Sequence, residues 1–495
     1  MTDASLDLVG AIVAASVLVI HLLTVLRAIT RPNRTPASRV AWVATIMTLP
    51  VIGVVAYLLL GETSIGPERV RRLNEAEQAL AAPSGARAEP GDPVAASVSD
   101  LCRSINGYRP TSGNRVVLLG DPAATAAEPT RDCDQAIRGL IEAIEAATEH
   151  VHVSFYIWLD DGNGGRVADA ISAAARRGVT CRIMADALGS RDFVRGPRWR
   201  QLRDAGAQLQ VALRDIPRMG SATVGRVDLR NHRKLVVIDN RIAFCGSQNC
   251  ADPQFLIKKK YAPWIDVLLR CEGPVVRQAQ HLFLSNWIAE ADESGEDLYG
   301  LPAAGPEPEQ YADGVVAQMF GTGPTTPGNT MSDAFVSALY AAERELIITT
   351  PYFVPDQALL RAVCAAPRRG VETTLVVPAH NDSALVAAAC RSAYPDLLRS
   401  GVRLFEYPLG LLHTKTLTID GRITLVGSAN MDRRSLELNF ENNLLVLDRG
   451  VTKTIRDRQL GYLSESTAIE AKTVDHWPFR ARLVDNTIGM ASPVL

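Results

Sequence analysis

The sequence predicts an α/β protein in which an N-terminal two-helix transmembrane hairpin precedes two α/β/α halves that share one active-site cleft. Three observations lead to this prediction. The first 60 residues contain two long apolar runs, and the rest of the chain alternates between strand-like and helical segments. That alternation occurs twice, and each copy ends on the same H-x-K-x4-D motif. A chain of 495 residues is long enough for two or three domains.

Composition narrows the possible partners. The chain is 47% hydrophobic and 21% charged, and its formal net charge is -2, so nothing in the overall charge indicates nucleic acid as a partner. No protein partner can be inferred either. The eight cysteines form no C-x-x-C pair, and several lie in apolar runs. They are interpreted as small core residues and not as disulfides or metal ligands.

The two apolar runs predict a multi-pass protein of the cell membrane. Residues 8–26 contain one titratable side chain, His21, and residues 40–60 contain no charge. Each run is close to the roughly 20 residues that cross a bilayer as a helix. A cleaved signal peptide fits poorly, because Asp3 and Asp7 stand where a basic patch is usual. Pro50 is expected to kink the second helix. Arginines flank the second run on both sides, so its orientation stays open.

The remainder divides into a connecting segment and two halves. Residues 1–62 form the hairpin, 63–115 an amphipathic helix and linker, 116–310 the first half and 311–495 the second half. Strand-like runs at 150–159 and 181–185 match runs at 346–354 and 373–377. Strands that alternate with helices predict a largely parallel sheet covered by helices. Two halves packed face to face would bring both motifs to one cleft.

The two motif copies agree at every fixed position. The first contains His232, Lys234, Asp239, Gly246, Ser247 and Asn249, and the second contains His413, Lys415, Asp420, Gly427, Ser428 and Asn430, at the same offsets. In a strand, a histidine and a lysine two residues later lie on one face. The Gly-Ser pair allows close backbone approach, and the asparagine can add an amide donor.

Each residue alone has an ordinary structural interpretation. A histidine in a strand is usually structural, and Asp239-Asn240 and Asp420-Gly421 resemble hairpin turns. A duplicated fold explains the glycines and the apolar positions. It does not explain two histidines and two lysines at matching places, so we interpret them as one shared site.

A paired His/Lys set suits phosphodiester chemistry. One imidazole attacks phosphorus, while the other protonates the departing alkoxide and then takes a proton from the incoming hydroxyl. The lysines and asparagines supply charge and donors to the phosphate oxygens. Asp239 and Asp420 are expected to orient the histidines and favour their charged form. No cofactor or metal is expected, because no carboxylate cluster suited to a metal is evident.

The motifs resemble the phospholipase D superfamily, and other segments narrow this resemblance to bacterial cardiolipin synthases. These segments include Phe155-Tyr156-Ile157-Trp158, Arg230-Asn231-His232-Arg233-Lys234, Thr350-Pro351-Tyr352-Phe353 and Asn439-Phe440-Glu441. The resemblance covers nearly the whole chain.

This resemblance implies that two phosphatidylglycerol molecules in the membrane give cardiolipin and glycerol. It also implies that His232 is the nucleophile and His413 the acid and base, and that the substrate is bound by Ser247, Asn249, Ser428, Asn430 and Glu441. The first half departs from the family pattern at Asn240, Gly246-Ser247 and Ala251-Asp252-Pro253, which bears on the acceptor preference. The alternatives are a hydrolytic phospholipase D that releases phosphatidic acid, a nuclease, and a membrane-anchored binding scaffold.

Overall fold

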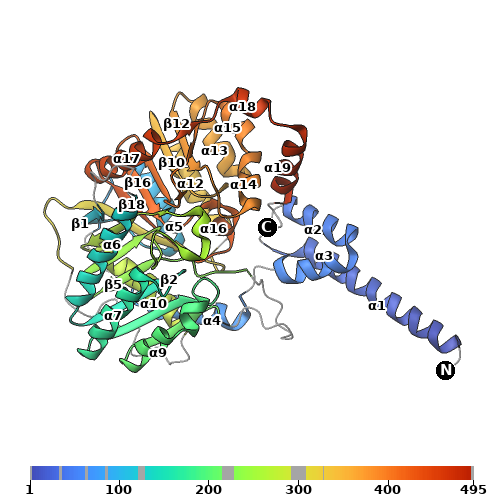
Figure 1. Ribbon diagram of the computed structural model, residues 1–495, viewed down its shortest axis with the longest axis horizontal. Helices are drawn as coiled ribbons and strands as arrows, with labels where there is room; N and C mark the ends of the chain where they lie inside the picture. The colour runs from blue at the N-terminus through green and yellow to red at the C-terminus, as the bar shows by residue number, and fades with distance from the viewer. Residues whose placement is uncertain are drawn as a thin grey trace. The chain divides into compact units, whose positions relative to one another are not determined.

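The computed structural model describes residues 3–32, 36–61, 65–83, 87–120, 129–214, 228–290, 308–326 and 328–491. The described residues divide into two compact units. Figure 1 shows the chain coloured by residue number from the N-terminus to the C-terminus. We call the part up to Pro67 the helical unit, and Glu68–Arg214 with Arg230–Gly489 the α/β unit. The predicted boundary at residue 62 lies outside the described residues.

The helical unit begins with one long apolar helix, α1 (Asp3–Thr30). Its segment Leu8–Thr30, with a mean hydropathy of 2.5, is the one helix in the described part of the chain that is long and apolar enough to cross a membrane. The second apolar run forms α2 (Pro36–Thr48), α3 (Pro50–Ala56) and a π-helical turn (Tyr57–Gly61). The chain breaks where Pro50 cannot donate a helical hydrogen bond, as expected. A hairpin of two continuous spanning helices is therefore not confirmed.

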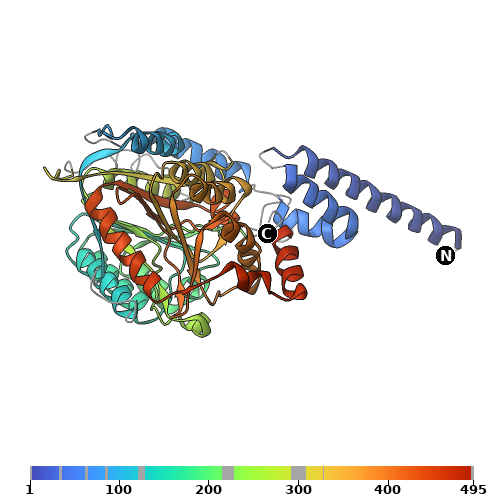
Figure 2. The same cartoon turned by 90° about the horizontal axis from the view of Figure 1, so that it is seen from above.

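A small core holds α2 and α3 to the C-terminal part of α1 (Figures 1 and 2). Trp42 and Tyr57 pack edge to face with ring centroids 5.3 Å apart. Gly53 lies so close to α2 that a Cβ atom would overlap with the carbonyl oxygen of Thr45. The core consists of Ala28, Trp42, Ile46, Val54 and Tyr57.

One 15-stranded sheet runs through the α/β unit and repeats its strand order. In the first half the order is β4 (Gln208–Ala212), β3 (Thr180–Asp186), β2 (His150–Phe155), β5 (Leu235–Ile238), β6 (Ile242–Gly246), β8 (Leu268–Glu272) and β1 (Thr111–Leu118). In the second half it is β13 (Arg403–Tyr407), β12 (Glu372–Pro378), β10 (Glu345–Thr349), β15 (Thr416–Ile419), β16 (Ile423–Gly427), β18 (Glu441–Leu447) and β9 (Val315–Thr322). The short strand β19 (Thr467–Ala468) pairs with β13. Strands β1 and β9 pair, so the halves join edge to edge and not face to face as expected.

The sheet is mixed, and the expectation of a largely parallel sheet is corrected. Only β2, β3 and β4, and likewise β10, β12 and β13, pair in parallel. The motif strand of each half forms an antiparallel hairpin with the next strand. The first two residues of its turn have positive φ, 52° and 53° at Asp239 and Asn240 and 53° and 65° at Asp420 and Gly421. The predicted hairpin turns are confirmed, and a turn of three residues cannot join parallel strands.

Helices cover both faces of the sheet. In the first half, Val236 and Ile238 pack against α6 (Pro129–Glu145) and α7 (Gly162–Arg176), while Leu235 and Val237 face α10 (Val275–Glu290). In the second half, α5 (Pro93–Asn106), α12 (Thr330–Tyr340) and α13 (Gln357–Arg368) cover one face, and α17 (Arg449–Ser464) packs on the other. All eight cysteines are free thiols and all but Cys364 are buried, which confirms their interpretation as core residues.

Candidate active site

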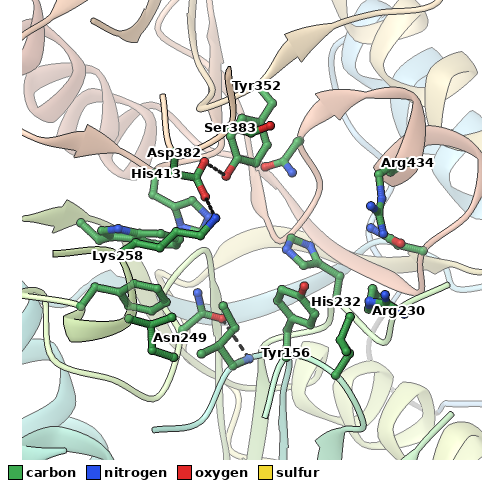
Figure 3. A pocket seen from close by; sticks show the side chains of 18 of the residues that line it. Tyr156, Arg230, His232, Asn249, Lys258, Tyr352, Asp382, Ser383, His413 and Arg434 are labelled. Atoms are coloured by element: carbon green, nitrogen blue, oxygen red, sulfur yellow. Dashed lines mark hydrogen bonds and ion pairs between the residues drawn. The ribbon is translucent and has the colours of Figure 1, made fainter. Parts of the chain in front are cut away.

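The two motifs meet in one cavity of about 580 Å³. Figure 3 shows His232 and His413 in its wall, one from each half. The motif strands begin only at Leu235 and Thr416, so histidine and lysine lie in an extended segment just before each strand. There the lysine ammonium donates to the carbonyl oxygen of its own histidine, at 2.8 Å in the first half and 2.6 Å in the second.

Each histidine is paired with a buried carboxylate from the other half. The Nδ1 atom of His232 lies 3.0 Å from Oε2 of Glu441, and Nδ1 of His413 lies 2.7 Å from Oδ1 of Asp266. Because Nδ1 is occupied by the carboxylate, Nε2 is the ring nitrogen left for a substrate in the cavity.

Backbone pairing between the halves explains this exchange. The amide of His413 donates to the carbonyl of Ile265 at 2.8 Å, where β7 (Trp264–Ile265) pairs with β14 (Leu411–Leu412). In the same way the amide of His232 donates to the carbonyl of Phe440 at 2.9 Å. Each acid directly follows the residue that holds the opposite histidine.

Asp239 and Asp420 do not orient the histidines, and this expectation is corrected. The carboxylate of Asp239 accepts hydrogen bonds from the backbone of residues 148–150, and that of Asp420 from the backbone of residues 343–345. An aspartate seven residues after the histidine along an extended strand lies roughly 20 Å from it. These two side chains anchor the hairpin turns at the far end of the sheet.

The Gly-Ser pairs support the carboxylates from behind. A Cβ atom on Gly246 would overlap with the carbonyl oxygen of Val267, so the predicted close backbone approach is confirmed. Ser247 exchanges hydrogen bonds with the backbone of Val267, and the hydroxyl of Ser428 donates to the carboxylate of Glu441. Ser247, Ser428 and Glu441 lie behind the histidines and do not line the cavity, in contrast to their expected place in substrate contact.

Asn249 and Asn430 do line the cavity. The Oδ1 atom of Asn249 accepts from the amide of Ile157 at 3.3 Å, and its buried Nδ2 atom has no hydrogen-bond partner among the described residues. The amide nitrogen of Asn430 donates to Asp432 at 3.1 Å. A buried amide donor that faces a cavity fits a phosphate oxygen.

Burial dominates the electrostatics of the site. It lowers the pKa of His232 and of His413 to about 4, although the carboxylate beside each raises it. It also lowers the pKa of Lys234 to about 8. Burial raises the pKa of the Glu441 carboxyl, but His232 and Lys234 outweigh this effect and hold it at about 2. At neutral pH the free site therefore holds neutral imidazoles beside an ionised carboxylate.

The sequence analysis did not identify three residues of the site: Asp266 and the aromatic residues Tyr156 and Trp264, which pack beside the histidines. The ring of Tyr156 lies 4.8 Å from that of His232, and the ring of Trp264 lies 4.7 Å from that of His413. Asp266 could have been found by aligning the repeats beyond the motif, because it precedes β8 much as Glu441 begins β18. A longer segment after Asn249 hides this match in the first half.

The repeated sheet and the paired His-Lys sites define a phosphatidyltransferase of the phospholipase D type. A family model described as "Cardiolipin synthase, PLD-like domain" matches residues 140–282 and 335–459, and one described as "Phospholipase_D-nuclease N-terminal" matches residues 13–62. The chain is 36% identical over 476 residues to cardiolipin synthase A of Cronobacter sakazakii and 36% identical over 475 residues to that of Klebsiella pneumoniae, with 94% of each chain covered. The chain belongs to the cardiolipin synthases.

A solved structure supports the fold. Phosphatidylserine synthase of Haemophilus influenzae superposes with a TM-score of 0.56 at 13% identity, over 80% of this chain and 99% of that chain. The family match establishes cardiolipin synthesis as the activity, and the apolar helix α1 supports a membrane location.

Proposed function

We propose that the protein transfers a phosphatidyl group from one phosphatidylglycerol molecule to another through a phosphohistidine, with release of glycerol. One observation carries this proposal: two buried imidazoles share one cavity, and each has a carboxylate on Nδ1. The arrangement leaves one Nε2 atom to form a bond to phosphorus and the other to move a proton.

In the first step the Nε2 lone pair of His232 attacks phosphorus. The bond from phosphorus to the glycerol oxygen breaks, and protonated His413 gives its proton to that oxygen, so glycerol leaves. Asn249 and Asn430 line the cavity and offer amide groups to the phosphate oxygens, while the buried ammonium groups of Lys234 and Lys415, held on the histidine carbonyl oxygens, supply positive charge from behind the cavity wall.

In the second step neutral His413 takes the proton of a hydroxyl on the second phosphatidylglycerol. The resulting oxygen attacks phosphorus, the bond to His232 breaks, and cardiolipin forms. His413 must be protonated at the start of the cycle. An anionic phosphodiester in the cavity raises its pKa, and Asp266 stabilises the imidazolium.

The rim of the cavity fits a substrate that comes from a bilayer. Leu188 and Ile257 line the cavity and are 51% and 59% exposed. Leu256, next to Ile257 in the chain, is 64% exposed, and Leu385, next to the cavity-lining Val386, is 53% exposed. Lys259 and Lys260 follow as exposed basic side chains. Exposed apolar side chains next to basic ones suit an anionic lipid surface.

We also propose that the second apolar run enters the membrane together with α1, which would make the protein multi-pass. Val40, Val51 and Ile52 present exposed apolar side chains, and the run carries no charge. A cysteine accessibility assay on the full chain tests this. If both runs cross, cysteines introduced at the exposed positions Pro32 and Pro67 are labelled from opposite sides of the membrane, and labelling from the same side would contradict a second crossing.

Product analysis tests the transfer. Purified full-length protein in vesicles of phosphatidylglycerol should produce cardiolipin and free glycerol in equal amounts. Phosphatidic acid as the sole lipid product would overturn the transfer in favour of the hydrolytic reaction.

A further inference from the structure

The cavity wall beside His413 contains a charged cluster that the two-histidine chemistry does not use. The Nζ atom of Lys258, from the 3-10 helical segment η2 (Leu256–Tyr261), lies 2.5 Å from Oδ2 of Asp382. The hydroxyl of Tyr352 donates to Oδ1 of the same carboxylate at 2.6 Å. All three residues line the cavity, and Figure 3 shows them on the His413 side, away from Arg230 and Arg434.

We propose that this wall is the acceptor subsite, where Asp382 accepts hydrogen bonds from the glycerol hydroxyls of the second phosphatidylglycerol and Lys258 binds that molecule's own phosphate. The proposal rests on the transfer described above, with His413 as the base of the second step.

The direction of attack places the acceptor on this side. The incoming oxygen approaches phosphorus opposite the bond to His232, and it gives its proton to His413. The glycerol unit that carries this oxygen must therefore lie against the wall next to His413, and its phosphate lies one glycerol unit away.

The cluster has the right donors and acceptors for this ligand. The Asp382 side chain is only 5% exposed, and a carboxylate with two oxygens can accept further hydrogen bonds besides those from Lys258 and Tyr352. The Lys258 side chain is 41% exposed, and its ammonium has three donors. A diol that carries a phosphate matches an acceptor and a cation placed side by side, whereas water and simple alcohols lack the phosphate.

The opposite wall is less suitable for the acceptor. Arg230 and Arg434 both act electrostatically on Tyr156, whose ring lies 4.8 Å from that of His232. They lie on the side of the nucleophile, whereas the incoming oxygen must lie on the other side of phosphorus.

Competition between two acceptors tests the subsite. A donor lipid that carries p-nitrophenol in place of glycerol forms the phosphohistidine with a leaving group that has neither the diol nor the second phosphate. The intermediate is then offered phosphatidylglycerol and ethanol together, and cardiolipin and phosphatidylethanol are quantified. Their ratio is fixed after the intermediate forms, so it does not depend on the rate of the first step or on the fraction of enzyme that is folded.

We expect Asp382→Asn and Lys258→Gln each to lower the ratio of cardiolipin to phosphatidylethanol by about 10- to 100-fold. Asp192→Asn, which changes another acid in the cavity wall, is the matched control and should keep the ratio of the unaltered protein. An unchanged ratio in both cluster variants would overturn the subsite, as would a fall confined to Arg434→Gln, which would place the acceptor beside His232. Failure of the unaltered protein to form any cardiolipin would instead refute the proposed transfer itself.

Discussion

The imidazole of His413, in the second half of the chain, is paired at 2.7 Å with the carboxylate of Asp266, which belongs to the first half. Glu441 and His232 form the reciprocal pair at 3.0 Å. Each histidine therefore depends on an acid from the opposite repeat, 147 residues away for His413 and 209 residues away for His232. We expect this dependence to give separate effects on the two steps.

We expect Asp266→Asn and Glu441→Gln to slow different steps by roughly 10²- to 10⁴-fold, because an amide cannot stabilise an imidazolium as a carboxylate does. With the p-nitrophenol donor, Glu441→Gln should slow the release of p-nitrophenol, since it acts on His232. Asp266→Asn should mainly slow the formation of cardiolipin, since it acts on His413. Asp266→Glu keeps the charge and should recover part of the rate. Equal losses in both steps for both variants would contradict separate roles.

Substitution of the hairpin aspartates should affect stability more than chemistry. Asp239→Ala and Asp420→Ala each remove three hydrogen bonds from backbone amides, so we expect the free energy of unfolding to fall by about 2–4 kcal/mol. Burial raises the pKa of the Asp239 carboxyl, but the backbone donors outweigh it and hold the pKa below its ordinary value. Its stabilising effect is thus fully present above about pH 4 and is lost as the pH falls through the lowered pKa. Denaturant titration at pH 7 and at low pH measures both effects, and full stability at pH 7 would refute this role.

Binding of an oxyanion at pH 7 should take up about one proton. Burial holds the pKa of His413 near 4 in the free site, so the imidazole starts neutral, and a bound anion raises that pKa toward neutrality. Tungstate is titrated calorimetrically in buffers of different ionisation enthalpy. The slope of the apparent binding enthalpy plotted against the ionisation enthalpy of the buffer gives the number of protons taken up. We expect His413→Asn to lose the proton uptake. A slope of zero in the unaltered protein would contradict the inference that the His413 imidazole becomes protonated when an anion binds.

The order of the histidines can be read from a trapped intermediate. p-Nitrophenol needs little help to leave, so His413→Ala should still form a phosphatidyl adduct and accumulate it, because the base for the second step is missing. His232→Ala should form none. Mass spectrometry of the peptides that contain each motif locates the adduct. An adduct on His413 in the His232→Ala protein would reverse the two roles.

Much of this architecture could be predicted from the sequence, since it depends on local patterns and on repetition. Apolar runs between helical segments predicted the strands, the Asp239-Asn240 and Asp420-Gly421 pairs predicted the turns, and identical spacing predicted that both histidines share one site. Motif spacing also led to one wrong role. Asp239 follows His232 closely in sequence, but an extended strand separates the two side chains.

The remaining features depend on contacts between distant segments. The β1–β9 pair that joins the halves, and the β7–β14 pair that places Asp266 beside His413, bring together residues more than a hundred positions apart. Nothing in a local pattern specifies such partners. The segment after Asn249 is also longer in the first half than its counterpart in the second, so the match between Asp266 and Glu441 is displaced in a simple comparison of the repeats.

The exchanged carboxylates limit how this chain can be divided or recombined. A fragment that carried only the first half would contain a histidine without its acid and an acid without its histidine, and the same holds for the second half. Neither fragment would therefore contain a complete histidine-carboxylate pair. In a chimera, a new second half must be compatible with both His232 and Asp266 of the old first half, so the two repeats are inherited as one functional unit.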